Sequence, residues 1–220
     1  MIVADGLKFI IGGLILTIAF ALFAAGKDSI TFLIIAVIFA VMTLFLTFFY
    51  RNPARRIPTD DNLILSIADG TVLSVQDIDN AFIGGKGKKV SIFLSVFNVH
   101  VNRTPAAGQI EYANYNPGKF FAAFEDKASK ENEQTEIGLS FKAGKMIFKQ
   151  IAGILARRVV CNLKAGQAVS AGELFGLIHF GSRAELFLPD NIEIMVKKGD
   201  KVKGGETVIG RIMSAEEGRL

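Results

Sequence analysis

Residues 30–58 read ITFLIIAVIFAVMTLFLTFFYRNPARRIP, and the chain changes character within this stretch. Its first part, up to residue 50, carries no charged side chain, whereas Arg51, Arg55 and Arg56 follow directly. A helix needs about 20 apolar residues to cross the hydrocarbon core of a bilayer. Basic residues that flank such a span favour the cytoplasmic side. The stretch therefore predicts a membrane-spanning helix that leads into a polar, cytoplasmic part of the chain.

A second apolar segment lies towards the N-terminus, where residues 9–25 read FIIGGLILTIAFALFAA. The connector GKDS at residues 26–29 leaves room only for a tight turn between antiparallel helices. Residues 1–50 are thus predicted to anchor the chain in the cell (inner) membrane with two transmembrane helices, both ends cytoplasmic. The alternatives are a cleaved signal peptide or an interfacial first segment, but the first segment leads straight into the second span.

Residues 51–220 are predicted to form the second domain, and from Pro58 onward the sequence shows short alternating runs broken by glycine, a pattern typical of β structure. The predicted class is mainly β (α+β), a barrel- or sandwich-like domain behind the two transmembrane helices. Helical spacing of phenylalanines predicts one short helix over residues 120–130. Strands are predicted at residues 70–75, 89–102, 109–115, 137–143, 145–151, 157–162, 174–180, 185–188, 192–196 and 207–212.

A weak internal repeat supports this architecture. GQAVSAGE at residues 166–173 and GDKVKGGE at residues 199–206 share the form G-x-x-V-x-x-G-E, which suits a turn leading into a strand. Such hairpins are common in lipoyl-like domains. A carrier domain would also need an exposed lysine at a tight hairpin tip, and no lysine here has that context. A non-enzymatic, membrane-tethered carrier or adaptor is therefore kept only as the alternative from another class.

Composition narrows the chemistry. The single cysteine, Cys161, excludes an internal disulfide and a multi-cysteine metal site. The chain has two histidines and no G-x-S-x-G or phosphate-cradling glycine loop, so neither a metal site nor a conventional hydrolase is predicted. A net charge of +4 suits anionic lipid head groups beside a bilayer. No nucleic-acid partner is predicted.

One dipeptide has distinctive chemistry. Gly181-Ser182 is the only Gly-Ser pair, and it interrupts the apolar run LIHFGSRAELFLP at residues 177–189. Glycine tolerates unusual backbone angles, so a sharp turn is expected there. A serine hydroxyl at such a turn can attack the preceding carbonyl and convert the peptide to an ester. Elimination and hydrolysis then leave a pyruvoyl group. On spacing alone, however, a Gly-Ser pair is usually only a turn.

Several segments together resemble the short form of the phosphatidylserine decarboxylase family. FGSR at residues 180–183 is similar to its processing site, and SVFNVHVNRTP at residues 95–105 is similar to its histidine strand. The resemblance extends, in the same order, to ADG at residues 68–70, KASKENE at residues 127–133 and IAGILARR at residues 151–158. It covers the chain from about residue 50 onward.

This resemblance implies specific roles. Ser182 would be the nucleophile of self-cleavage after Gly181 and would become the pyruvoyl group, the covalent cofactor. Residues 1–181 would form the β chain and residues 182–220 the α chain, and Asp69 and His100 would polarise Ser182. His179 is a possible auxiliary residue or a half-exposed strand histidine without a role, and Arg183 would meet either the lipid or a neighbouring glutamate.

The resemblance also implies a reaction. Phosphatidylserine, the lipid partner in the membrane, would form a Schiff base with the pyruvoyl group, lose CO₂ and leave as phosphatidylethanolamine. An archaetidylserine substrate, which has the same head group on ether-linked tails, is the alternative within this class. Arg103 stands where longer family members carry a second histidine, which leaves His100 to act alone. A homo-oligomer is compatible with the sequence.

Overall fold

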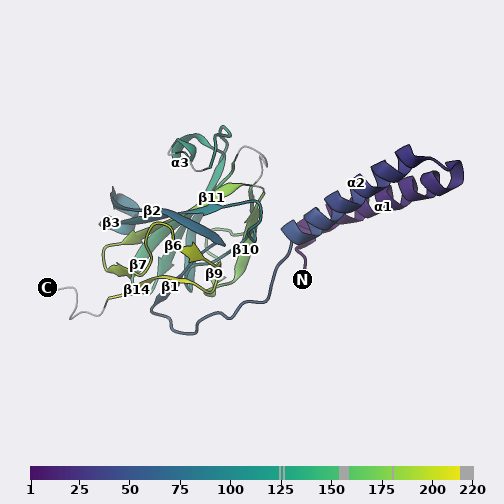
Figure 1. Ribbon diagram of the computed structural model, residues 1–220. Helices are drawn as coiled ribbons and strands as arrows, with labels where there is room; N and C mark the ends of the chain where they lie inside the picture. The colour runs from purple at the N-terminus through teal and green to yellow at the C-terminus, as the bar shows by residue number, and fades with distance from the viewer. Residues whose placement is uncertain (124, 126, 154–158, 180, 214–220) are drawn as a thin grey trace. The chain divides into compact units, whose positions relative to one another are not determined.

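The structure is a computed structural model that describes residues 1–123, 125, 127–153, 159–179 and 181–213. The chain divides into two compact units, Met1–Ala54 and Arg55–Leu220. The first unit is helical and the second consists mainly of β-strands, as Figure 1 shows. The mainly β class and the two apolar N-terminal helices predicted from the sequence are confirmed.

The first unit is an antiparallel hairpin of α1 (Ala4–Lys27) and α2 (Ile30–Phe49). Asp28 ends α1 with φ 46°, and its N–H donates to the carbonyl of Ala24. Phe20 and Phe39 stack between the helices, with ring centroids 5.5 Å apart. Most other side chains of the hairpin face outward, and both helices are long and apolar enough to cross a membrane.

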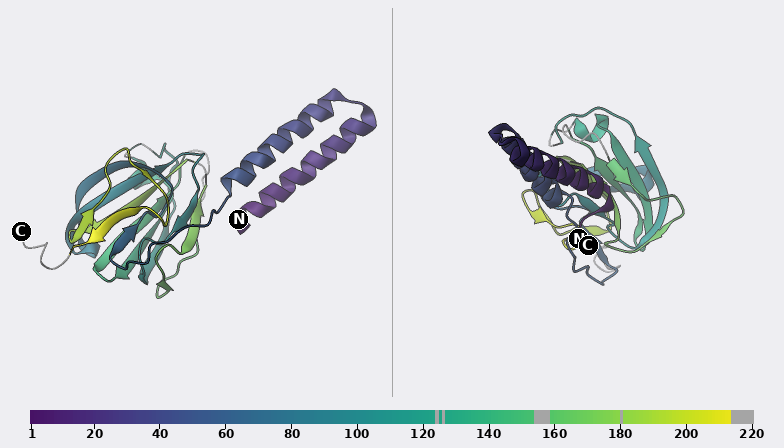
Figure 2. Two further views of the ribbon diagram at one scale, coloured as in Figure 1. Left: turned by 60° about the horizontal axis from the view of Figure 1, so that its bottom comes forward. Right: turned by 90° about the vertical axis from the view of Figure 1, so that its right-hand side faces the viewer.

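The second unit is built on a curled, antiparallel eight-stranded sheet (Figure 2). Its strand order is β13-β2-β3-β11-β7-β6-β5-β9. The bounds, in the same order, are Lys201–Val202, Gly70–Asn80, Gly85–Leu94, Ser182–Pro189, Gly144–Ile151, Gln134–Phe141, Gly108–Asn116 and Ala168–Val169.

Two three-stranded antiparallel sheets complete the unit. One has the order β4-β10-β8, with bounds Val101–Arg103, Leu174–Ile178 and Val159–Cys161. The other has the order β1-β14-β12, with bounds Leu63–Leu65, Val208–Ile212 and Ile192–Ile194. The apolar core fills the space between the sheets. Phe148 of β7, for example, meets Phe175 of β10 edge to face at 5.2 Å.

Two predicted elements differ from the structure. The predicted strand 89–102 is interrupted after Leu94, because Asn98 closes a turn by accepting the N–H of Ser95 on its side-chain oxygen at 2.9 Å. The predicted helix 120–130 is reduced to α3 (Ala128–Glu131), and residues 124 and 126 lie outside the described residues. At Phe121, both backbone polar groups bond to the side chain of Asn132, so they are not available for a helical ladder.

The remaining predicted strands are present with shifted ends. The strand predicted at 185–188 begins earlier, at Ser182, and the strand predicted at 70–75 extends to Asn80. Parts of two predictions, residues 157–158 and residue 180, lie outside the described residues. Lengthening of this kind is expected, because strand ends are set by the partners across the sheet rather than by the local sequence.

Candidate active site

Among the connections between the large sheet and the β4-β10-β8 sheet are three whose flanking strands are neighbours in both sheets, and the Gly-Ser pair lies at the central one. They are residues 95–100 from β3 to β4, residues 152–158 from β7 to β8, and residues 179–181 from β10 to β11. In the large sheet β11 lies between β3 and β7, and in the small sheet β10 lies between β4 and β8. The cleavage site proposed from the sequence is therefore flanked by the other two crossings.

Ser182 is the first residue of β11 and pairs with Leu94, the last residue of β3. The alternation of β11 places Ser182 on the same face as the core residues Ala184 and Leu186. Its side chain is fully buried, and its Oγ has no hydrogen-bond partner among the described residues. Burying an unpaired hydroxyl costs about 1–3 kcal/mol, so this oxygen calls for a functional explanation.

Gly181 precedes this serine with φ 64°. This left-handed backbone conformation suits glycine and is unfavourable for residues with a Cβ. The sharp turn predicted from the Gly-Ser pair is therefore present. It is the point at which the chain leaves the small sheet and enters the large one.

His100 is the last residue of the β3–β4 connection rather than part of a strand, and it is fully buried. Its Nδ1 lies 3.0 Å from the carbonyl oxygen of Asn98, and its own carbonyl accepts the N–H of Ile178 at 3.2 Å. When Nδ1 donates to Asn98, Nε2 is the nitrogen that can accept a proton. His100 is therefore a buried, hydrogen-bonded histidine rather than a solvated one. His179 is also buried, at 8% exposure.

Asp69 directly precedes β2 and makes an ion pair with Arg55. Both of its carboxylate oxygens lie 2.9 Å from Nη2 of Arg55, and one accepts the N–H of Gly204 at 2.8 Å. These are its hydrogen bonds in the described part of the chain, so the structure does not bond Asp69 to His100 or Ser182. Instead, Asp69 holds the turn at residues 203–206 against the segment that carries Arg55.

Glu206 and Arg103 extend this charged cluster. Glu206 accepts the backbone N–H of Arg56 at 3.0 Å and approaches Arg55 at 3.4 Å. The Arg56 N–H, followed by the charge of Arg55, lowers the pKa of Glu206 below its ordinary value. Arg103 donates to the carbonyl of Gly172 at 2.9 Å. Burial, then the charge of Arg55, lowers the pKa of its guanidinium. Arg103 is thus part of the same charged cluster as Arg55, Asp69 and Glu206.

Arg183 and Glu185 lie on the other face of β11 from Ser182. Their side chains are 2% and 1% exposed, and Nε of Arg183 is 2.9 Å from Oε1 of Glu185. The hydroxyls of Ser91 and Ser129 both donate to the same carboxylate oxygen, at 3.1 and 2.6 Å. Of the two partners considered for Arg183, the structure places the neighbouring glutamate against it.

Sequence reasoning missed a pair of buried amides on the Ser182 face. Gln150 lies opposite Ala184 in the pairing of β7 with β11. Its Nε2 donates to Oδ1 of Asn102 at 2.8 Å and to the carbonyl of Val160 at 3.2 Å. The pair joins the two sheets beside the site. The available signal was an uncharged amide side chain within each of the two strands, Gln150 in β7 and Asn102 in β4.

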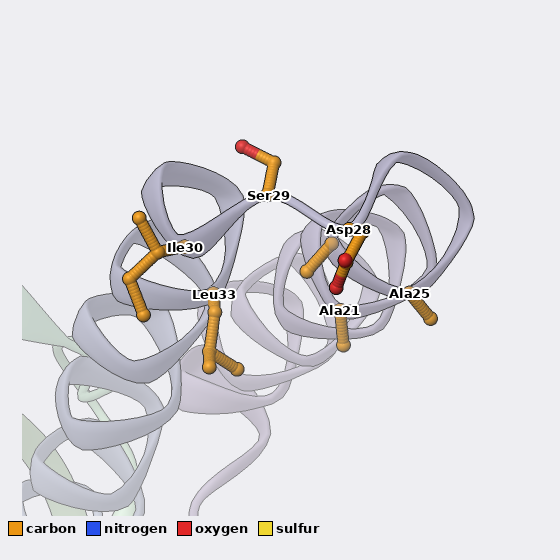
Figure 3. Close-up of a pocket in the computed structure, with 7 residues that line it drawn as sticks. Ala21, Ala25, Asp28, Ser29, Ile30 and Leu33 are labelled. Atoms are coloured by element: carbon orange, nitrogen blue, oxygen red, sulfur yellow. The ribbon is translucent and has the colours of Figure 1, made fainter.

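Other parts of the molecule carry less chemistry. Figure 3 shows a hollow at the tip of the helical hairpin, lined by small and apolar residues together with Asp28 and Ser29. Within the described ranges, no group of three or more His, Cys, Asp or Glu side chains could hold a metal ion. Cys161 is partly buried, and this burial raises the pKa of its thiol. None of these features adds a reactive group to the three crossings.

Comparison with known proteins first defines the class. A family model described as Phosphatidylserine decarboxylase matches residues 42–210, so the protein is a decarboxylase. The chain belongs to the phosphatidylserine decarboxylase family.

Individual relatives agree with this assignment. A "Phosphatidylserine decarboxylase proenzyme" from Pelobacter propionicus is 42% identical and covers 94% of this chain and 95% of its own length. Proteins of the same name from Chlorobium phaeobacteroides and Carboxydothermus hydrogenoformans are 46% and 47% identical. Each covers 78% of this chain, and 81% and 82% of its own length, respectively. The similarity thus extends over most of the chain and of each relative.

Proposed function

We propose that the protein is a proenzyme that cuts itself between Gly181 and Ser182 and then decarboxylates phosphatidylserine to phosphatidylethanolamine. The observation that carries this proposal is the buried Oγ of Ser182, which has no hydrogen-bond partner among the described residues and lies directly behind a left-handed Gly181. Relatives named as proenzymes support a processing step. The buried serine also fits a cofactor that is made from the chain itself.

Self-cleavage requires only residues of this chain and one water. Oγ of Ser182 adds to the carbonyl carbon of Gly181, and the C–N bond breaks to leave an ester and a free amine. Elimination then breaks the Cβ–Oγ bond of the serine, which releases residues 1–181 with a carboxylate at Gly181. The dehydroalanine left at position 182 takes up water and loses ammonia, which gives the pyruvoyl group. The masses and electrons balance without an external oxidant.

His100 is the proposed base for the first step. It is buried on the neighbouring crossing, and the Asn98 carbonyl next to Nδ1 favours proton acceptance at Nε2. Asp69 supports the site as a positioning residue, because its ion pair with Arg55 and its bond to Gly204 hold the surrounding segments. His179 is proposed only as an auxiliary residue, since it lies three residues before Ser182.

In decarboxylation, the pyruvoyl group would supply an electrophilic carbonyl that condenses with the substrate amine and takes up the electron pair released with CO₂. The chain holds this reactive end in place. Strand β11 begins at residue 182 and is paired on one side with β3 and on the other with β7. The α chain would therefore stay paired within the sheet of the β chain after the cut.

The hairpin supports a location at the membrane. Two apolar helices followed by Arg51, Arg55 and Arg56 favour the cell (inner) membrane with the β unit on its cytoplasmic face. The names of the relatives favour the diacyl lipid over archaetidylserine as substrate. The names of these relatives do not support the alternative of a non-enzymatic carrier or adaptor domain.

The direct test is the release of labelled CO₂ from phosphatidylserine that carries the label in its serine carboxyl group, assayed in mixed detergent micelles. The wild-type protein should produce phosphatidylethanolamine, while Ser182→Ala should produce none. An archaeal ether-linked serine lipid, assayed in parallel, separates the two substrates. Equal CO₂ release by Ser182→Ala would overturn the proposed mechanism.

A further inference from the structure

The carbonyl of Gly181 lies directly against the backbone of Gly153 on the neighbouring β7–β8 crossing. An ideal Cβ placed on Gly153 would overlap the carbonyl oxygen of Gly181 and lie 2.8 Å from its carbon. Gly153 has no left-handed φ, so the backbone conformation alone does not require glycine there. What requires glycine is the close approach to the bond that is proposed to break.

The residue before Gly153 is fixed at both of its backbone polar groups. The N–H of Ala152 donates to the carbonyl of Glu133 at 2.9 Å, and the carbonyl of Ala152 accepts Nδ2 of Asn132 at 2.8 Å. Ile151, one residue earlier, is paired with Arg183 of β11. Gly153 therefore has little freedom to move away from Gly181.

Asn132 is the centre of this arrangement. Its side chain is 1% exposed and makes three hydrogen bonds, each of 2.8 Å and each to a backbone group. Besides Ala152, it binds the N–H and the carbonyl of Phe121. With its oxygen and both donors engaged in this way, the amide is suited to hold chain segments together rather than to bind a lipid.

We propose that Asn132 and Gly153 are positioning residues for self-cleavage, which hold the Gly181 carbonyl in the orientation that Ser182 attacks. This inference rests on the proposed function. It gives a role to KASKENE and IAGILARR, two segments whose function the mechanism above leaves open.

The physical reason is the geometry of carbonyl addition. Oγ must approach one face of the Gly181 carbonyl carbon, and a peptide that can rotate or shift presents that face only part of the time. The backbone of Gly153, which lies directly against this carbonyl, restricts such movement. Misplacement of a reacting group by about 1 Å can cost about 100-fold in rate. An added methyl at position 153 forces a shift of this kind.

The first test compares cleavage of wild-type protein and Gly153→Ala after synthesis, in the absence and presence of hydroxylamine. Hydroxylamine cleaves an ester but not a peptide, so it reports whether the attack by Ser182 has taken place. We expect Gly153→Ala to be cut about 100-fold more slowly, with no gain from hydroxylamine. Rapid hydroxylamine cutting of this variant would show that the ester forms normally, and would overturn the inference.

Folding is controlled by a matched pair of uncut proteins. Ser182→Ala and Ser182→Ala/Gly153→Ala both remain precursors, so the difference between their thermal midpoints reports only the effect of the added methyl. We expect both to unfold cooperatively. If the wild-type protein itself is not cut, the proposed function fails. If the wild type is cut and folded Gly153→Ala is cut at the same rate, only the positioning role fails.

Asn132→Asp tests the same role through pH. The ionised carboxylate keeps the acceptor for Phe121 N–H but loses both donors, and it faces the carbonyls of Phe121 and Ala152. Protonation restores one donor. The cleavage rate of this variant relative to wild type should therefore rise as the pH falls. A ratio that does not change with pH, or a normal rate at neutral pH, would contradict the role of the amide.

Discussion

Arg183 and Glu185 form a buried ion pair, with Nε and Oε1 2.9 Å apart, on the face of β11 opposite to Ser182. Arg183 also donates to the hydroxyl of Ser91 at 3.0 Å and to the carbonyl of Glu125 at 3.3 Å, while Ser129 donates to Glu185. One face of the strand thus carries Ser182, the serine proposed to react. The other face holds Glu125 and Ser129 to the sheet, although these residues are distant from β11 in sequence.

Removal of one partner of this pair should be strongly destabilising. Arg183→Met leaves Glu185 buried without its counter-charge, and such a loss costs about 3–5 kcal/mol. Arg183→Met/Glu185→Leu should be less harmful than the single change, because no unpaired charge remains. Chemical unfolding of each variant in the uncut Ser182→Ala background measures this. A single variant as stable as its parent would show that the pair contributes little.

His100→Gln should stop or greatly slow self-cleavage, because glutamine keeps a polar side chain but cannot take the proton of Ser182. Loss of a general base typically costs about 100- to 10,000-fold. Gel analysis of freshly made protein separates the uncut chain from its products. His179→Gln is compared in parallel, since that histidine is also buried but is proposed only as an auxiliary residue, and its loss should slow cutting less. Normal cutting of His100→Gln would move the base to another residue.

Asp69→Asn should weaken the attachment of the turn at residues 203–206. The amide keeps the shape but lacks the charge that binds Arg55, so a loss of about 1–3 kcal/mol is expected. Self-cleavage should slow as well, through loss of positioning. Arg55→Met should produce a similar loss, and the double variant should be less than additive. Full additivity would mean that the two residues act independently.

The charge of Glu206 should give a pH-dependent contribution to stability. Its pKa is lower in the folded protein than its ordinary value of 4.5, mainly through the Arg56 N–H and then Arg55. A lowered folded pKa stabilises the fold above the unfolded value, and this contribution is lost as the pH falls through the folded pKa. The stability difference between wild type and Glu206→Gln should therefore be present at pH 7 and shrink below about pH 4. A constant difference would refute the assignment.

Local sequence patterns predicted the elements whose formation depends on residues close together along the chain. The uncharged run before Tyr50 predicted α2, and the run at residues 185–188 predicted the central part of β11. The Gly-Ser pair indicated a sharp turn, and Gly181 has φ 64°. In each case the signal is set by neighbours along the chain, so no tertiary information was needed.

The features that were missed depend on distant partners. His100 reads as a strand residue between two valines, but Asn98 closes a turn just before it. The helix predicted over residues 120–130 is reduced to α3, because the side chain of Asn132, which follows α3, bonds to both backbone polar groups of Phe121. The bond between Gln150 and Asn102 joins different sheets. The hydrophobic periodicity of the sequence does not predict such contacts, because they form only once the sheets have paired.

Intact-mass spectrometry of the detergent-purified protein tests the central claim most directly. The account predicts two chains, one ending at Gly181 and one beginning at residue 182. The smaller should be lighter by one ammonia than a fragment that begins with unmodified serine. A single chain of 220 residues in active protein, or a fragment that retains the serine amine, would contradict a pyruvoyl group made from Ser182.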